Sequence, residues 1–178
     1  RKNTKRVLQA FHKYTLENCS DYKLVIVGLN ISKLESIMPE LSFLDDLKSN
    51  IVLTDYVSDE ELPVIFKLAQ LFLFPSLREG FGIPLLEAMA SGIPTITSNT
   101  SSMPEVAGNA ALLIDPNKTE EIYDGIKKIL SNNRFRDELI NKGLARSKSF
   151  SWFNAAQSVF NIYEQLYNEY KTKMNGKK

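Results

Sequence analysis

The chain has almost no cysteine or histidine and no long hydrophobic segment. Its 178 residues include one cysteine, Cys19, and one histidine, His12, so an internal disulfide is excluded and no Cys/His spacing indicates a zinc site. The longest apolar runs, such as 24–27 and 71–74, are strand-sized and fall far short of the roughly 20 residues that a membrane-spanning helix needs. These absences favour a protein of the reducing cytoplasm.

The chain also has almost no net charge. Twenty-two Lys and Arg residues stand against 21 Asp and Glu residues, which leaves a formal charge of +1. There is therefore no global field that would attract nucleic acid or an anionic membrane, and any anion site must be local. With 43% hydrophobic and 24% charged residues, the composition is that of a globular protein with a buried core.

Strand-like and helix-like segments alternate along the sequence. Apolar, β-branched runs predict strands at 23–27, 51–53, 71–74, 94–97 and 111–114. Helical spacing predicts helices at about 4–17, 32–48, 58–70, 83–90, 103–106, 119–130, 134–147 and 151–170. Strands separated by helices need right-handed crossovers, so the expected fold is α/β, a doubly wound parallel sheet covered on both faces. Nothing divides residues 1–178, so one domain is expected.

Local signals refine two of these helices. Ser58 and Glu61 have the spacing of a capping box, which predicts a helix start, and Pro63 is expected inside that helix, where it would kink it. The last helix carries aromatic residues at helical spacing, which predicts a packing stripe, and its polar tail from Lys171 is expected to fray. The stripe consists of Trp152, Phe153, Phe160, Tyr163 and Tyr167.

The segment that follows the predicted strand 71–74 has the features of an anion site. Ligands of a doubly wound sheet bind beyond the carboxyl ends of its strands, where this segment lies. Gly80 and Gly82 remove side chains where the loop turns into a helix, and Pro84 suits the first helical turn. The N–H groups of Gly82, Ile83 and Leu85 can then face a bound diphosphate.

Two carboxylates flank the same turn, Glu79 before the glycines and Glu87 one turn into the helix. Carboxylates accept hydrogen bonds, so a pair of them beside a phosphate site predicts recognition of hydroxyl groups, as on a ribose and a hexose. The alternative is that the glycines make only a tight turn and that the glutamates are solvated. The density of these features favours a nucleotide-sugar site.

Residues 79–87 resemble the Glu-x7-Glu signature of the retaining group 1 glycosyltransferases, also called family 4, which have the GT-B fold. Residues 57–62, 88–94 and 104–108 are similar to other segments of that family, so the resemblance covers nearly the whole chain. It implies that 1–178 is the C-terminal, Rossmann-like domain of a two-domain hexosyltransferase. Such an enzyme transfers a sugar from a UDP- or GDP-sugar to an acceptor with retention of anomeric configuration.

The resemblance also implies roles for individual residues. Glu79 would contact hydroxyls of the donor sugar and Glu87 would bind the ribose. The loop that contains Gly80, Phe81, Gly82 and Ile83 would hold sugar and phosphate through its backbone amides.

Further residues are matched outside this loop. Lys2 matches a basic residue that neutralises the diphosphate, with Arg1 beside it, so Glu79 and Lys2 are the candidate catalytic residues. Gly28, Val57 and Leu62 are candidates for lining the nucleotide. The alternative, which the sequence favours equally, is that Gly28 only makes a turn and that the two aliphatic residues belong to the core.

The family's domain begins with a further strand, and a separate N-terminal domain binds the acceptor; both are expected upstream of this sequence. Without that strand, neighbouring strand edges are expected to be unpaired, and the chain alone is expected to bind a donor without catalysing transfer. The resemblance implies a carbohydrate or lipid-linked acceptor and a role in polysaccharide biosynthesis. The sequence shows no acidic metal-binding motif, so no metal or cofactor is expected to be required, and the expected cytoplasmic position is compatible with peripheral contact at the inner face of the membrane. A non-catalytic nucleotide-binding module and a nucleotide-sugar epimerase of the same architecture are the alternatives.

Overall fold

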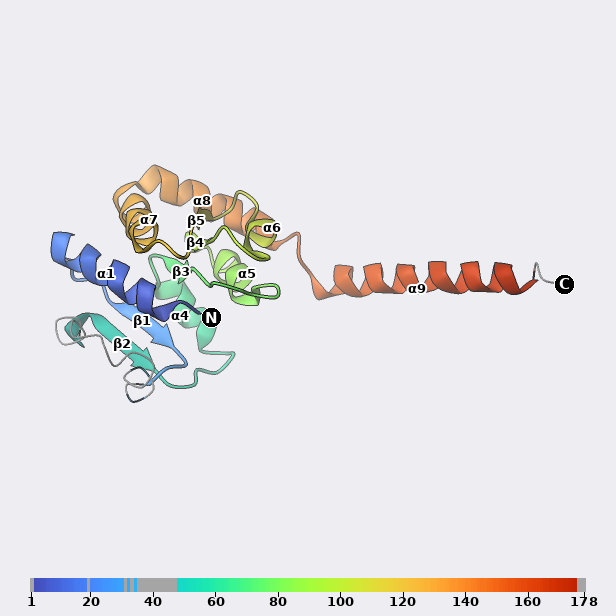
Figure 1. The fold of residues 1–178 in the computed structure, drawn as a ribbon, viewed down its shortest axis with the longest axis horizontal. Helices are drawn as coiled ribbons and strands as arrows, with labels where there is room; N and C mark the ends of the chain where they lie inside the picture. The colour runs from blue at the N-terminus through green and yellow to red at the C-terminus, as the bar shows by residue number, and fades with distance from the viewer. Residues whose placement is uncertain (1, 19, 31, 33, 35–47, 176–178) are drawn as a thin grey trace.

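The computed structural model describes residues 2–18, 20–30, 32, 34 and 48–175 (Figure 1). Its elements, in chain order, are α1 (Thr4–Asn18), β1 (Leu24–Val27), the 3-10 turn η1 (Lys48–Asn50), β2 (Ile51–Thr54), α4 (Leu62–Leu68), β3 (Phe72–Phe74), α5 (Ile83–Ala90), β4 (Thr95–Ser98), α6 (Met103–Ala107), β5 (Leu112–Ile114), α7 (Thr119–Ser131), α8 (Asn133–Ser147) and α9 (Trp152–Asn175). The predicted alternation is confirmed, and the helix predicted at 32–48 lies largely outside the described residues.

The strands pair only in parallel, as the alternation predicts. β1 pairs with β2, and β3, β4 and β5 form a second sheet in that order. In the described part of the chain the strands therefore form two sheets where one continuous sheet is expected, because no described strand joins β1 to β3. The α/β class and the parallel arrangement are confirmed.

Helices cover both faces of the three-stranded sheet. Successive residues of β3 point to opposite faces: Leu73 packs toward α1 and α7, whereas Phe72 and Phe74 pack toward α5 and α6. The first core contains Ala10, Tyr14, Ile96, Ile114, Ile122, Tyr123, Ile126, Ile129 and Leu139. The second contains Phe74, Leu85, Met89, Met103, Val106, Ala107, Ala110 and Ala111.

Among the described residues, the two-stranded sheet is covered on one face. Its inner side chains, Leu24, Ile26, Ile51 and Leu53, pack around Leu8 of α1 and Leu34. On the opposite face Val25, Val27 and Val52 are 41–43% exposed. No described helix packs on this side, and most of the helix predicted at 32–48 lies outside the described residues.

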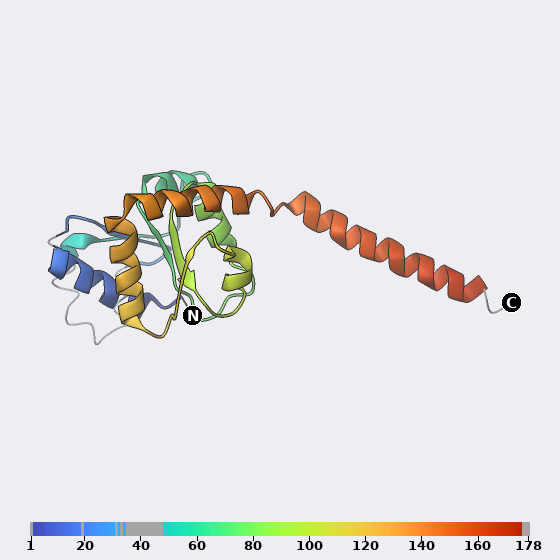
Figure 2. The same ribbon diagram turned by 90° about the horizontal axis from the view of Figure 1, so that it is seen from above.

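Helix α9 extends away from the rest of the molecule, as both views show (Figures 1 and 2). All the aromatic residues of the predicted stripe are exposed on it, Trp152 to 82%. The predicted packing of this stripe is therefore not made within the described structure. Helix α9 continues to Asn175, beyond the predicted end at about residue 170.

The two hydrogen bonds of the predicted capping box form, but in the turn directly before α4, which begins at Leu62 and not at Ser58. The N–H of Ser58 donates to Glu61 Oε2 at 3.0 Å, and the N–H of Glu61 donates to Ser58 Oγ at 3.3 Å. The backbone N–H of Ser58 above all, and then its hydroxyl, hold the pKa of the Glu61 carboxyl below its ordinary value. Pro63 lies in the first turn of α4 and not in its interior, so its missing N–H removes no helical hydrogen bond and no kink results.

Glu61 is expected to make the stability of the chain depend on pH. Because its pKa is lowered on folding, its carboxylate stabilises the folded state above the unfolded pKa of about 4.3, and this contribution is lost as pH falls through the folded value. In urea unfolding, we expect Glu61→Gln to be less stable than wild type at neutral pH and the difference to shrink toward zero near pH 3. Glu60→Gln removes a neighbouring exposed carboxylate and is the control; an equal Glu61→Gln difference at both pH values would contradict the assignment.

Candidate functional site

The loops that follow β3, β4 and β5 meet the N-terminus of the chain at one edge of the three-stranded sheet (Figure 1). Asn3 joins two of these loops, because its Nδ2 donates to the carbonyl of Pro75 at 3.0 Å and to that of Pro116 at 2.7 Å. The carboxyl ends of parallel strands are where a doubly wound fold places its ligand. A ligand site is therefore expected at this edge.

Glu79 and Lys2 form an ion pair at this edge. Lys2 Nζ lies 3.1 Å from Glu79 Oε1, and the glutamate side chain is only 6% exposed whereas the lysine side chain is 57% exposed. Lys2 Nζ also lies 4.8 Å from the centre of the Phe74 ring. A buried carboxylate is costly unless it is paired and hydrogen-bonded, so the lysine stabilises Glu79 in its ionised form. The structure thus brings the two candidate catalytic residues together.

Serine hydroxyls hold the chain around Glu79. Ser76 Oγ donates to Glu79 Oε1 at 3.0 Å, and Ser98 Oγ donates to the carbonyl of Ser76 at 2.7 Å. Ser101 Oγ donates to the Glu79 carbonyl at 2.6 Å and accepts from its N–H at 3.3 Å, and Ser102 Oγ donates to the same carbonyl at 3.1 Å. The glutamate is therefore fixed through its carboxylate and through its backbone.

Sequence reasoning did not select these serines. The available signal was the run of polar residues at 98–102, directly after a buried strand at the ligand edge. Ser101 also has a φ of 59°, a left-handed conformation that is uncommon for residues other than glycine. Its two hydrogen bonds to Glu79 give a structural reason for that conformation.

The glycine loop leads into α5 as the sequence predicts. Gly82 is the N-cap of α5, with φ 94° and ψ 49°. Within the described residues, the N–H groups of Phe81, Gly82 and Ile83 have no hydrogen-bond acceptor, so they are available to an anion at the positive end of the helix. Leu85 differs from the expectation, because its N–H donates to the Gly82 carbonyl at 2.9 Å.

The two glycines have different structural roles. A Cβ at Gly82 would lie 2.4 Å from Met103 Cε, so this position is glycine because of its positive φ and its contact with the core. A Cβ at Gly80 would have nothing within 4 Å. Of these two glycines, only Gly80 therefore has open space beside its Cα that a ligand could occupy.

The other candidates are more dispersed. Glu87 is exposed on α5, and its side chain makes no hydrogen bond or ion pair with a described residue. Gly28 has a φ of 77° after β1, and its N–H donates to the carbonyl of Asp55 at 3.2 Å. Val57 is half-buried after β2. Leu62 packs against the cluster of Phe66, Ala88 and Ile93, which matches its alternative as a core residue. Arg1 lies outside the described residues.

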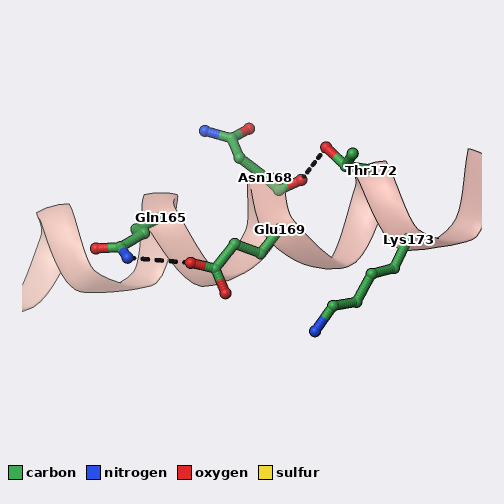
Figure 3. A pocket seen from close by; sticks show the side chains of 5 residues that line it. All are labelled: Gln165, Asn168, Glu169, Thr172 and Lys173. Carbon is green, nitrogen blue, oxygen red and sulfur yellow. Dashed lines mark hydrogen bonds between the residues drawn. The ribbon is translucent and has the colours of Figure 1, made fainter.

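Outside this edge, the described residues form no metal site and no membrane-spanning helix, and a hollow on α9 is not enclosed. Among the residues whose placement is given, no three His, Cys, Asp or Glu side chains lie close enough to hold a metal ion, and no helix is both long and apolar enough to cross a membrane. Figure 3 shows a hollow on α9 beside Gln165, Asn168, Glu169, Thr172 and Lys173. All five belong to one exposed helix, so no second element encloses a ligand there.

The two glycines are expected to respond differently to alanine. Gly82→Ala should destabilise the chain by about 1–2 kcal/mol, because alanine is strained in this left-handed backbone and the end of the Met103 side chain must shift to admit its Cβ. Gly80→Ala should change stability by less than about 0.5 kcal/mol, since its Cβ enters open space. Thermal unfolding of both variants measures this, and equal losses would contradict the assignment of Gly82 to the core.

Comparison with known proteins agrees with this geometry. The family described as "Glycosyl transferases group 1" matches residues 1–146. The O-antigen chain mannosyltransferase B of Escherichia coli is 36% identical over 166 residues, which are 93% of this chain and 43% of that protein. The chain therefore spans less than half the length of this relative.

Solved structures agree on the fold. Sucrose-phosphate synthase from Thermosynechococcus elongatus superposes with a TM-score of 0.80 at 23% identity, over 95% of this chain and 43% of that one. The C-terminal domain of a glycosyl transferase group 1 family protein from Francisella tularensis gives a TM-score of 0.71 at 22% identity, over 83% and 78%. With the family match, these findings show that the chain belongs to the group 1 glycosyltransferases and has a Rossmann-like half of the GT-B fold.

Proposed function

We propose that this chain is the donor-binding domain of a hexosyltransferase, and that it binds a nucleoside-diphosphate sugar between Lys2, Glu79 and the start of α5. The observation that carries the proposal is the Lys2–Glu79 ion pair of 3.1 Å beside the glycine loop. A cation, a carboxylate and three unpaired N–H groups together match the phosphates and hydroxyls of such a donor.

Lys2 and the amides of Phe81, Gly82 and Ile83 would bind the diphosphate. The lysine is more than half exposed, so a ligand can reach its ammonium group while Glu79 remains in contact. When the bond from sugar to phosphate breaks, negative charge grows on the departing diphosphate. A fixed ammonium group and a helix N-terminus stabilise that charge without reorganisation.

Glu79 would bind the sugar. Its carboxylate accepts hydrogen bonds only, and it is held by Ser76 and Lys2, so it can orient sugar hydroxyls over the reacting carbon. Glu87, exposed on α5, would bind the ribose, and Gly80, Gly28, Val57 and Leu62 would border the donor. Transfer with retention of anomeric configuration is the reaction that the family resemblance implies for this arrangement.

The hexose is proposed to be mannose, because the relative with 36% identity is a mannosyltransferase. That protein is more than twice as long as the matched segment, so the acceptor, a carbohydrate or a lipid-linked one, would be bound by another part of the complete enzyme. The second candidate is a module that binds nucleotides without transferring sugar, because the groups at the described site are ones that bind phosphates and hydroxyls. Acceptor-dependent turnover of the donor separates the two.

Thermal unfolding with UDP, GDP, ADP, CMP and their sugar conjugates tests donor binding. A ligand of the native state at 100 times its Kd stabilises by about 2.7 kcal/mol. We expect an upward shift of Tm that is selective for UDP or GDP compounds. A folded sample whose Tm is unchanged by every compound would overturn the proposal.

The two glutamates are expected to affect different ligands. Glu87→Ala should weaken the free nucleotide and the nucleotide sugar alike, because it removes a ribose contact common to both. Glu79→Ala should weaken mainly the nucleotide sugar, because the hexose is absent from the free nucleotide. Calorimetric titration of both variants, with Glu60→Ala as an exposed control, measures the two Kd values; equal losses for both ligands in both variants would refute this division of roles.

A further inference from the structure

Asn3, the residue between Lys2 and the start of α1, is buried, has a left-handed backbone and forms two long-range hydrogen bonds. It is 8% exposed, its φ is 61°, and its side-chain amide spans two loops of the ligand edge. We propose that Asn3 is a positioning residue that fixes Lys2 in place for the diphosphate. This inference rests on the proposed function, in which Lys2 binds the diphosphate.

The backbone of Asn3 sets the direction in which Lys2 enters the site. Its left-handed conformation turns the chain from Lys2 into α1, and its carbonyl accepts the hydrogen bond from the N–H of Val7 that begins the helix. That conformation costs roughly 1–2 kcal/mol for most residues, whereas glycine and asparagine adopt it readily. The residue type at position 3 is therefore restricted by the backbone alone.

The side chain of Asn3 joins Lys2 to the loop that carries Glu79. An amide group has two N–H donors, and both are used, one on the Pro75 carbonyl and one on the Pro116 carbonyl. Arg6 Nη1 donates to Asn3 Oδ1 at 3.2 Å and so orients the amide. Pro75 directly precedes Ser76, the residue that donates to the Glu79 carboxylate.

The contacts of the Lys2 ammonium group do not fix the backbone from which the side chain extends. That side chain is long, flexible and more than half exposed, so its ion pair with Glu79 holds the ammonium group and leaves the main chain of Lys2 to be held by its neighbour. Fixing the backbone of the adjacent residue removes much of the freedom that a ligand would otherwise have to restrict. Asn3 thus acts on the phosphate through Lys2 and without touching the ligand.

A double-mutant cycle tests this mechanism. Asn3→Gly retains the left-handed backbone but removes both N–H···O bonds, and Lys2→Met removes the charge. We expect Asn3→Gly to weaken binding of GDP or UDP about tenfold in the wild-type background and to have no further effect in the Lys2→Met background. A general structural role would lower affinity by the same factor in both backgrounds, which would overturn the proposal.

The salt dependence of binding gives a second readout. Lys2 contributes a charge contact that salt screens, so the affinity of wild type should fall with ionic strength more steeply than that of Lys2→Met. Asn3→Gly should have the shallower slope of Lys2→Met. Asn99→Gly, at an exposed asparagine after β4 that makes no side-chain hydrogen bond with a described residue, is the matched control and should behave as wild type.

A measurement without nucleotide separates this inference from the proposed function. Acylation of lysine side chains, followed by mass spectrometry, reports how firmly Lys2 Nζ is held against Glu79. We expect Asn3→Gly to accelerate acylation of Lys2 severalfold and to leave Lys67, on α4, unchanged. An unchanged Lys2 rate would overturn the positioning role whatever the protein binds, whereas faster acylation with no GDP or UDP binding by wild type would support the role of Asn3 and reject the proposed function.

Discussion

The burial of one carboxylate organises the ligand edge of this fold. Glu79 is almost fully removed from solvent, and an ionised group in that position requires a cation and hydrogen-bond donors. Lys2 provides the cation and Ser76 a hydroxyl, while Ser101 and Ser102 hold the backbone of the same residue. The chain before α1 and the loops after β3 and β4 meet because each contributes to this one group.

The glycine loop shows how folding and binding requirements overlap at that edge. Gly82 begins α5, and its left-handed backbone and its contact with Met103 are both conditions of packing. Among the described residues, the adjacent N–H groups have no acceptor, and they lie at the positive end of a helix. A position that the core restricts to glycine thus also borders the proposed anion site, whereas Gly80 meets no such restriction.

Packing is uneven across the molecule. The sheet of β3, β4 and β5 is covered on both faces and carries the site, which gives Glu79 and α5 a rigid support. One face of β1 and β2 and the whole of α9 remain exposed, including large aromatic side chains such as Trp152. Nothing in the described structure covers these apolar surfaces, and the proposed site does not depend on them.

The sequence by itself determined the alternation of strands and helices, because periodicity and capping are local properties. The glycine turn before α5 and the capping box at Ser58 were predictable for the same reason. The pairing of Lys2 with Glu79, the serines around that glutamate and the amide bridge of Asn3 needed the tertiary structure, since each joins segments distant in sequence. The exposure of α9 also needed it: an amphipathic pattern specifies an apolar face, and only the packed chain decides what, if anything, covers that face.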